Sequence, residues 1–338
     1  MKKKLLLVTI LSFILVLAAC SGGSDDEQSA SGDAEYLIRL PHIVTTDHPA
    51  HEAAVNFKEE VEKLSDGRIE VQIFPNGELY GSDREIIEAL QLNNVEMSLV
   101  GTPSLGNFDE RFYVLDLPFL FEDREAPRKA LAGELGEELA KGIEEINLKA
   151  LGWGYDGFRH TLNSKHPIEK LEDFKGLKMR VQESELQESI FNALGANASP
   201  LAYGELYSAL QQNIYDGMDS PFSIIDSGKF YEVQDYLSLT SHQYSGLIIL
   251  MSLDFFNELP EDLQDAVVTA SKNIEEEYYQ MVDESEDTLL EELKEKMEVN
   301  EISPEEREKF VEAVQPVYEQ FRDVVGEDLI ELAKSANE

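Results

Sequence analysis

Apolar and polar residues along the chain alternate between two spacings, which predict strands and helices in turn. Short apolar runs bounded by turn residues predict strands at residues 36–40, 69–73 and 95–100. Apolar residues three or four positions apart predict one helix through Phe57 and a second helix at 83–93. Strands that alternate with helices are typical of a mostly parallel sheet with helices packed on it. We therefore expect an α/β fold.

The same patterns continue through the middle of the chain. Strands are expected at 148–154 and 177–181, and two further apolar strands, 236–240 and 247–252, are expected to flank His242. Helical spacing is found at residues 134–146, around Leu186, Ile190 and Leu194, and at 208–213.

Two segments between these elements have no regular pattern. Residues 155–163 lack helical periodicity, and residues 215–221 predict a turn because they contain Gly217 and Pro221. The Gly-x-Gly-x-x-Gly pattern at 152–157 therefore opens no helix, as a dinucleotide-binding motif must. We expect no cofactor.

The longest helical pattern begins after Pro260 and continues from Leu263 into a charge-rich stretch. A helix of about 36 residues runs on the order of 54 Å, which is longer than one small lobe. We expect this helix to span two lobes. A last helix, capped by Ser303, is expected to be interrupted near Pro316 and Gly326.

The N-terminal segment has the composition of a secretory signal. Lysines at positions 2–4 precede the apolar run 5–17, and small residues lead to Cys20, the only cysteine. This arrangement resembles the lipobox of bacterial lipoproteins, which predicts a signal peptide at 1–19 and a lipidated cysteine with a flexible tether at 20–34. The protein is then anchored to the cell membrane on its extracytoplasmic face. The alternative is an ordinary signal in which the cysteine occurs by chance.

Net charge narrows the classes of partner. The chain has 28 Lys and Arg residues against 68 Asp and Glu residues, and its formal net charge is −40. A surface of this sign repels nucleic acid and anionic headgroups, so we expect binding to neither. It also repels an anionic ligand unless a fixed local cation holds that ligand.

The sequence offers no positive case for catalysis. His48 and His51 are three residues apart across the start of a helix, and the remaining histidines offer no further metal ligands, so a structural or ligand-rim role is expected. No nucleophile elbow, phosphate-binding loop or zinc-protease motif occurs. We expect neither a metal nor a catalytic group.

A set of polar and aromatic residues at expected loop positions indicates a binding site instead. The set consists of Arg159, Arg180, Tyr203, Ser220 and His242. A site for an organic anion needs fixed cations, aromatic walls and hydroxyl or amide donors. Arg180 lies near the end of a short strand, where ligands of α/β proteins bind. The competing interpretation of Arg180 is a solvated arginine or a structural salt bridge.

A series of segments follows in a fixed order over nearly the whole chain after the tether. They are 65–71 (SDGRIEV), 157–164 (GFRHTLNS), 174–182 (FKGLKMRVQ), 193–196 (ALGA), 209–217 (ALQQNIYDG), 229–234 (KFYEVQ) and 259–264 (LPEDLQ). In this order and spacing they resemble the solute-binding component of tripartite ATP-independent periplasmic (TRAP) transporters, of the dicarboxylate-binding DctP type.

The resemblance implies a two-lobe fold like that of periplasmic binding proteins, with the long helix lying across both lobes. Lobe 1 is expected at 35–156 and 246–285, and lobe 2 at 157–245 and 286–338. The lobes are expected to close on a ligand between them.

The resemblance also implies ligand-binding roles. Arg180 is expected to pair with the substrate carboxylate, with Arg159 as a second ligand arginine. Tyr203 is expected to form the aromatic wall, and His242 to be a histidine of the cleft.

Further cleft residues are implied, with two departures from the family pattern. Glu183 stands where an amide is common and could select for a hydroxyl or cationic group, and Ser220 stands where an asparagine is common. His42, Tyr80 and Gly101 lie in first-lobe loops similar to those that complete the cleft.

The implied function is that of a monomeric, extracytoplasmic protein that captures an organic acid for the permease subunits of a TRAP transporter. The acid is expected to be a C4-dicarboxylate or a sugar acid. The main alternative is a secreted enzyme acting on a small organic acid in the cleft between the lobes. A third possibility is an adhesive or structural lipoprotein, which would bind no small molecule.

Overall fold

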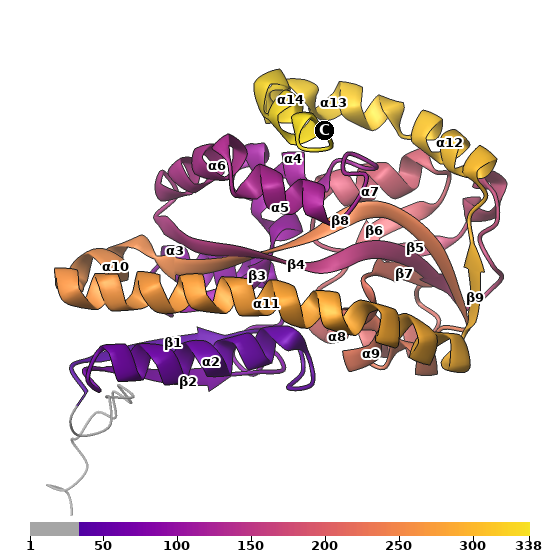
Figure 1. Ribbon diagram of the computed structural model, residues 1–338. Helices are drawn as coiled ribbons and strands as arrows, with labels where there is room; N and C mark the ends of the chain where they lie inside the picture. The colour runs from indigo at the N-terminus through magenta and orange to yellow at the C-terminus, as the bar shows by residue number, and fades with distance from the viewer. Residues whose placement is uncertain (1–33) are drawn as a thin grey trace, which may run out of the picture.

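The computed structural model describes residues 34–338, and the chain is built around two long strands and one long helix (Figure 1). The expected signal peptide, Cys20 and nearly all of the expected tether lie outside the described residues. From residue 34 onward, no helix is both long enough and apolar enough to cross a membrane.

The first strands and helices follow the predicted alternation. Strands β1 (Tyr36–Pro41) and β2 (Ile69–Phe74) pair in parallel as a small sheet, joined by helix α2 (Pro49–Leu64). Helix α3 (Asp83–Gln91) and strand β3 (Met97–Gly101) follow. The apolar stripe of α2 is buried, as its spacing predicts. The expected α/β class is confirmed.

Two strands run through the centre of the second sheet. β4 (Leu148–Asn163) and β8 (Tyr236–Ser252) are antiparallel neighbours in a seven-stranded sheet of order β3-β8-β4-β7-β5-β6, with β9 (Glu298–Glu301) beside β8. The expectation that the strand ends before 155–163, and that two separate strands flank His242, is wrong. Each segment is one continuous strand.

Buried polar residues explain why the sequence shows breaks there. Residues 241–246 contain no aliphatic side chain, yet all but Ser241 are buried. The pairing of β4 with β8 also shifts register at Tyr155/Gly157 and at Arg159/Thr161, so the strict alternation of a regular strand is lost.

The remaining strands of this sheet carry helices between them. β5 (Lys178–Val181) pairs in parallel with β6 (Asn197–Pro200) and with β7 (Gly217–Ser220), and β7 pairs with β4. The expected turn at 215–221 is wrong because its second half forms β7, which is fully buried and central. The helices are α7 (Glu185–Ala193), α8 (Tyr203–Gln211), which begins before the expected 208, and α9 (Phe222–Ser227).

Shorter helices pack against β4 and β8 or against each other. They are α4 (Tyr113–Asp116), α5 (Glu125–Leu131), α6 (Glu134–Glu144) and α10 (Leu253–Glu258). Single 3₁₀ turns occur at Thr102–Asn107, Glu110–Phe112, Leu171–Phe174 and Phe230–Glu232.

Helix α11 (Glu261–Lys296) has 36 residues, the length that the pattern predicts. Figure 1 shows it running along the whole molecule, from α2 at one end to α9 and β9 at the other. The C-terminal helices α12 (Pro304–Ala313), α13 (Gln315–Val325) and α14 (Glu327–Ser335) are interrupted where expected.

The hydrophobic core falls into two clusters. The smaller cluster joins α8, α9 and β7 to the far end of α11, and the larger cluster contains the rest, including α7 and the C-terminal helices. The boundary between the two clusters therefore differs from the expected lobe boundaries. The expected lobes, 35–156 with 246–285 and 157–245 with 286–338, stay a prediction.

Candidate ligand-binding site

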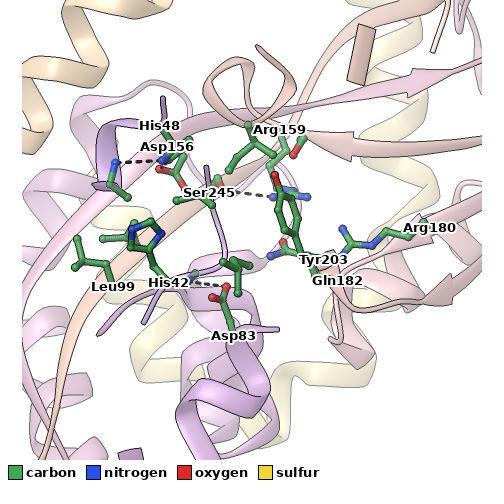
Figure 2. A pocket seen from close by; sticks show the side chains of 17 residues that line it. His42, His48, Asp83, Leu99, Asp156, Arg159, Arg180, Gln182, Tyr203 and Ser245 are labelled. Carbon is green, nitrogen blue, oxygen red and sulfur yellow. Dashed lines mark hydrogen bonds and ion pairs between the residues drawn. The ribbon is translucent and has the colours of Figure 1, made fainter. Parts of the chain in front are cut away.

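A buried cavity lies where β4, β5 and the start of α8 face the segment that leads into α2 (Figure 2). Its walls come from segments far apart in the sequence, from His42 to Leu247. Two guanidinium groups line one part of it, while carboxyl and imidazole groups line another.

Arg180 is a buried cation without a counterion. Its side chain extends from β5 and the residue is 4% exposed. Nε and Nη2 donate to the carbonyl oxygen of Leu201 at 2.9 and 2.7 Å, and among the described residues no carboxylate pairs with this guanidinium. Burial, together with repulsion by Arg159, lowers the pKa of Arg180 to about 10, so it stays charged at neutral pH. A solvated or ion-paired arginine does not fit this environment.

Arg159 is neutralised inside the protein. Its Nε donates to Oδ2 of Asp219 at 2.5 Å and its Nη2 to the carbonyl oxygen of Asp219 at 2.7 Å. Burial acts to raise the pKa of Asp219, but the charge of Arg159 and the hydrogen bond with His242 hold this pKa well below its usual range. The Nη1 atom of Arg159 is left to the cavity, with Oγ of Ser245 at 3.4 Å.

Tyr203 and Ser220 supply hydroxyl groups to the cavity. Tyr203 opens α8, and Figure 2 shows its ring standing in the cavity beside Arg159. Burial raises the pKa of Tyr203 to about 12, so the phenol stays protonated and can donate. Ser220 ends β7, is 3% exposed, and its hydroxyl has no hydrogen-bond partner within residues 34–338.

Two buried carboxyl groups also line the cavity. Asp83 begins α3, and its Oδ2 accepts from the amide of Gly101 at 3.0 Å. A side chain at Gly101 would place its Cβ 3.1 Å from that oxygen, a tight contact that would push the Asp83 carboxyl group back by a few tenths of an ångström. Burial raises the pKa of Asp83 to about 7.

Asp156 on β4 is the second carboxyl group. It accepts a hydrogen bond from the hydroxyl of Tyr278 on α11, and its Oδ1 lies 3.8 Å from Nε2 of His48. Burial raises the pKa of Asp156 to about 6. The long helix thus reaches the cavity wall through Tyr278.

The histidines of the cavity are neutral. Burial and the neighbouring histidines lower the pKa of His42 to about 4, and burial lowers that of His48 to about 3. His48 caps α2 through its Nδ1, and Nε2 of His42 lies 3.0 Å from Nδ1 of His51. Within residues 34–338, no cluster of three or more His, Cys, Asp or Glu residues could hold a metal ion.

The structure brings most of the sequence-predicted residues together. The lining includes Arg180, Arg159, Tyr203, Ser220, His42 and Gly101. The expectation that the predicted polar and aromatic set occupies loops is wrong. Its two arginines, Ser220 and His242 lie on strands, and Tyr203 begins helix α8.

Three predicted residues lie outside the lining. His242 stands behind the arginines, with its Nε2 3.3 Å from Oδ2 of Asp219 and its Nδ1 2.8 Å from Oγ1 of Thr240. Glu183 lines a separate hollow and pairs with Arg84 at 3.8 Å. Tyr80 packs at the edge of the core.

The residues that complete the polar walls were not predicted from the sequence; they are Asp83, Asp156, Gln182 and Ser245. Asp219, which pairs with Arg159 behind the wall, was not predicted either. For Gln182 a signal was available, because side chains two apart on a strand share a face. Gln182 follows Arg180 by two residues and lines the cavity with it, while Glu183 does not.

The arrangement is suited to binding an anion rather than to changing it. A charged guanidinium with free hydrogen-bonding capacity faces hydroxyl and amide groups. No side chain in the lining has both the nucleophilic group and the adjacent base that covalent catalysis needs.

Comparisons with known proteins agree with this chemistry. The family model for bacterial extracellular solute-binding protein, family 7 (DctP), matches residues 40–323. The C4-dicarboxylate-binding periplasmic protein DctP of Rhodobacter capsulatus is 33% identical over 306 residues, covering 89% of this chain and 90% of that protein.

Solved structures match over the same extent. The sugar acid binding protein DctPAm of Advenella mimigardefordensis, in complex with galactonate, has a TM-score of 0.87 at 35% identity, covering 90% of this chain and 98% of that one. A TRAP periplasmic solute binding protein of Sulfurospirillum deleyianum, with bound succinate, has a TM-score of 0.86 at 33% identity, covering 90% and 99%. These matches confirm the expected two-lobe fold.

The family model matches most of the chain, and the relatives are binding proteins rather than enzymes. The cavity also has the chemistry of an anion-binding site. The chain belongs to the bacterial extracellular solute-binding proteins of family 7, the DctP family of TRAP transporters.

Proposed function

We propose that this protein captures a small organic acid in the cavity and delivers it to the permease subunits of a TRAP transporter. Relatives bind galactonate in one case and succinate in another, so sugar acids and C4-dicarboxylates are the candidate ligand classes. The protein would act as a monomer.

The uncompensated charge of Arg180 carries this proposal. A buried cation without a counterion is costly, and a ligand carboxylate removes that cost by pairing with it. Two of the hydrogen-bonding nitrogens of Arg180 are held by Leu201, so the guanidinium is fixed in direction before the ligand arrives. Nη1 of Arg180 would donate to the carboxylate, and Nη1 of Arg159 would donate beside it.

Tyr203, Ser220, His42 and Gln182 would complete the contacts. Glu183, Tyr80 and His242 are not proposed as direct contacts because they lie outside the lining. His242 would act through Asp219, which it helps to hold against Arg159.

Contacts across the cavity support a closed arrangement of two lobes. The amide of Gly204 on α8 donates to the carbonyl oxygen of Gly81 at 3.0 Å, and Oγ1 of Thr45 donates to the carbonyl oxygen of Ser227 at 3.4 Å. We infer that ligand contacts with both lobes favour this state over an open one.

We further propose that Cys20 is acylated after cleavage of residues 1–19 and anchors the protein outside the cytoplasm. The lipobox-like sequence supports this. Mass spectrometry that finds a mature chain beginning at Cys20 without an acyl group would contradict it.

Calorimetry with a panel of organic acids tests the ligand proposal. Arg180→Ala should weaken binding of the best acid about 100-fold or more, because the carboxylate loses its buried partner. Arg180→Lys should also weaken binding, because an ammonium cannot reproduce the fork of a guanidinium. Arg322→Ala, at an exposed arginine of α13, is the matched control. Unchanged affinity in Arg180→Ala would overturn the proposal.

A further inference from the structure

We propose that the cavity selects monocarboxylates that carry hydroxyl groups over C4-dicarboxylates, and that Asp83 is the residue that decides this selectivity. The inference rests on the proposed function and names the substrate class of the same site. It follows from the balance of charge around the cavity and from the position of the Asp83 carboxyl group.

The cavity can neutralise one carboxylate. Arg159 and Arg180 are the cations in its lining, and Arg159 is already paired with Asp219. The imidazole of His42 is neutral at neutral pH because burial lowers its pKa to about 4. Arg180 therefore remains as the single unpaired positive charge in the lining.

A second carboxylate would meet acids rather than bases. The other ionisable groups in the lining are the carboxyl groups of Asp83 and Asp156, the protonated phenol of Tyr203 and the neutral histidines. Two carboxylates that share a buried space repel each other, so one of them must take up a proton or leave. The second carboxylate of a C4-dicarboxylate would therefore be repelled by the carboxyl groups of the cavity, whereas a hydroxyl group in its place would not.

Asp83 is placed to accept hydrogen bonds from a ligand. The residue is 7% exposed, and Oδ2 is held by the amide of Gly101. Oδ1 has no hydrogen-bond partner among the described residues, and Figure 2 shows the carboxyl group directed into the cavity. A ligand that fills the cavity would take this oxygen out of contact with water, so a ligand hydroxyl that donates to it would be favoured over a group that cannot.

Other polar groups around Asp83 suit the same ligand. Oε1 of Gln182 accepts from Nε2 of Gln187 at 3.0 Å, which leaves the amide NH₂ of Gln182 as a donor. The hydroxyl groups of Ser220 and Tyr203 can each donate or accept. Such groups discriminate ligands by their hydroxyl pattern, because an analogue without the hydroxyl leaves them unpaired.

Calorimetry with galactonate and succinate tests this selectivity. The wild-type chain should bind galactonate at least about 10-fold more tightly than succinate. Asp83→Asn keeps an oxygen for the amide of Gly101 and turns an NH₂ donor toward the cavity. This substitution should weaken the binding of galactonate and strengthen the binding of succinate. The ratio of the galactonate affinity to the succinate affinity should therefore fall about 10- to 100-fold. Glu88→Gln, at an exposed position on the same helix, should leave the ratio unchanged.

The possible results separate this inference from the proposed function. Tighter binding of succinate by the wild-type chain would overturn the selectivity while leaving an organic-acid-binding protein, and this comparison needs no variant to fold. An affinity ratio that is unchanged in Asp83→Asn, with an unchanged Tm, would overturn the role of Asp83. Absence of binding by every acid tested would overturn both proposals together.

Discussion

Asp219 has two roles: it stabilises the fold, and it neutralises the charge of Arg159 beside the cavity. It is fully buried, and its Oδ2 atom pairs with Arg159 and also accepts from His242. Because it neutralises Arg159, the positive charge left for a ligand is concentrated on Arg180. The pair therefore stabilises the fold and also sets the charge of the cavity.

Asp219→Ala should destabilise the protein by about 3–5 kcal/mol, because it leaves the Arg159 charge buried and unpaired. Asp262→Ala, which removes the exposed pair with Arg68, should cost at most about 1 kcal/mol. Denaturant unfolding of both variants measures the difference. Equal effects of the two substitutions would contradict the buried-pair argument.

Asp116 on α4 is a buried carboxyl group whose two oxygens have no hydrogen-bond partner among the described residues. Burial raises its pKa to about 8, although Gln243 and Arg159 oppose the shift. The folded state then binds a proton at pH values where the unfolded state does not. The free energy of unfolding should therefore fall as pH rises toward 8.

Asp116→Asn should remove the part of this fall that Asp116 contributes, which is at most about 1.4 kcal/mol per pH unit. A smaller fall should remain, because burial also raises the pKa of Asp83, to about 7. Denaturant unfolding between pH 7 and 8 is the measurement. In this range His42, His48 and His160 contribute little, because burial lowers their pKa values and their effect on the free energy of unfolding is complete above the unfolded-state pKa of 6.5. Parallel profiles for wild type and variant would refute the role of Asp116.

At the scale of single residues, the sequence could identify a binding-site residue when its side chain is unusual for the predicted element that carries it. Arg180 was such a group, as a guanidinium between the apolar residues Met179 and Val181 near the end of a strand. Asp83 was not, because an acid in the first turn of a helix is common for reasons of the helix dipole alone. Only the fold shows that this acid is buried and shares a cavity with Arg180.

At the scale of elements, the crossing of β4 over α11 depends on close approach. A Cβ at Gly154 would lie 2.7 Å from a ring carbon of Tyr278, the residue that also bonds Asp156. This glycine lets the helix lie against the strand that carries Arg159.

Gly154→Ala should destabilise the protein by about 1–3 kcal/mol, because Tyr278 must move to make room. Gly133→Ala, at the N-cap of α6, where the new Cβ would make only ordinary contacts, should cost less, about 0.5–1 kcal/mol. Thermal or denaturant unfolding distinguishes the two variants. A neutral Gly154→Ala would show that the helix is not held at this distance.

The elements that the sequence predicted well are those with one solvent-exposed face, such as α2 and α11. The long strands β4 and β8 were read as broken because polar side chains in their middle portions resemble a loop. Those side chains bond to each other instead, as Thr161 does with Thr240. Hydrogen bonds between segments far apart in sequence leave no periodic signal along the chain.

At the scale of the whole molecule, the connections between the lobes are few and long. The strands β4 and β8 and helix α11 run through or along both parts, so relative motion must bend these elements. The register shifts in the middle of the β4–β8 pair are places where the ladder is already interrupted and bends most easily.

Small-angle scattering with and without ligand should show compaction on saturation, since ligand contacts favour the closed state. Arg180→Ala should show no compaction at the same ligand concentration, and it serves as the control for nonspecific effects of the added acid. An unchanged radius of gyration in the wild-type chain would count against ligand-driven closure.

The contact between Gly204 and Gly81 has a consequence for how new specificities arise in such a scaffold. It joins two peptide groups rather than two side chains. Substitutions of lining residues such as Ser220 can therefore alter which acid is held while this bond stays intact. Gly204→Pro would remove the donor itself, since proline has no amide hydrogen. The specificity of the cavity for its ligand can thus change through substitutions that leave the contact between the two lobes unchanged.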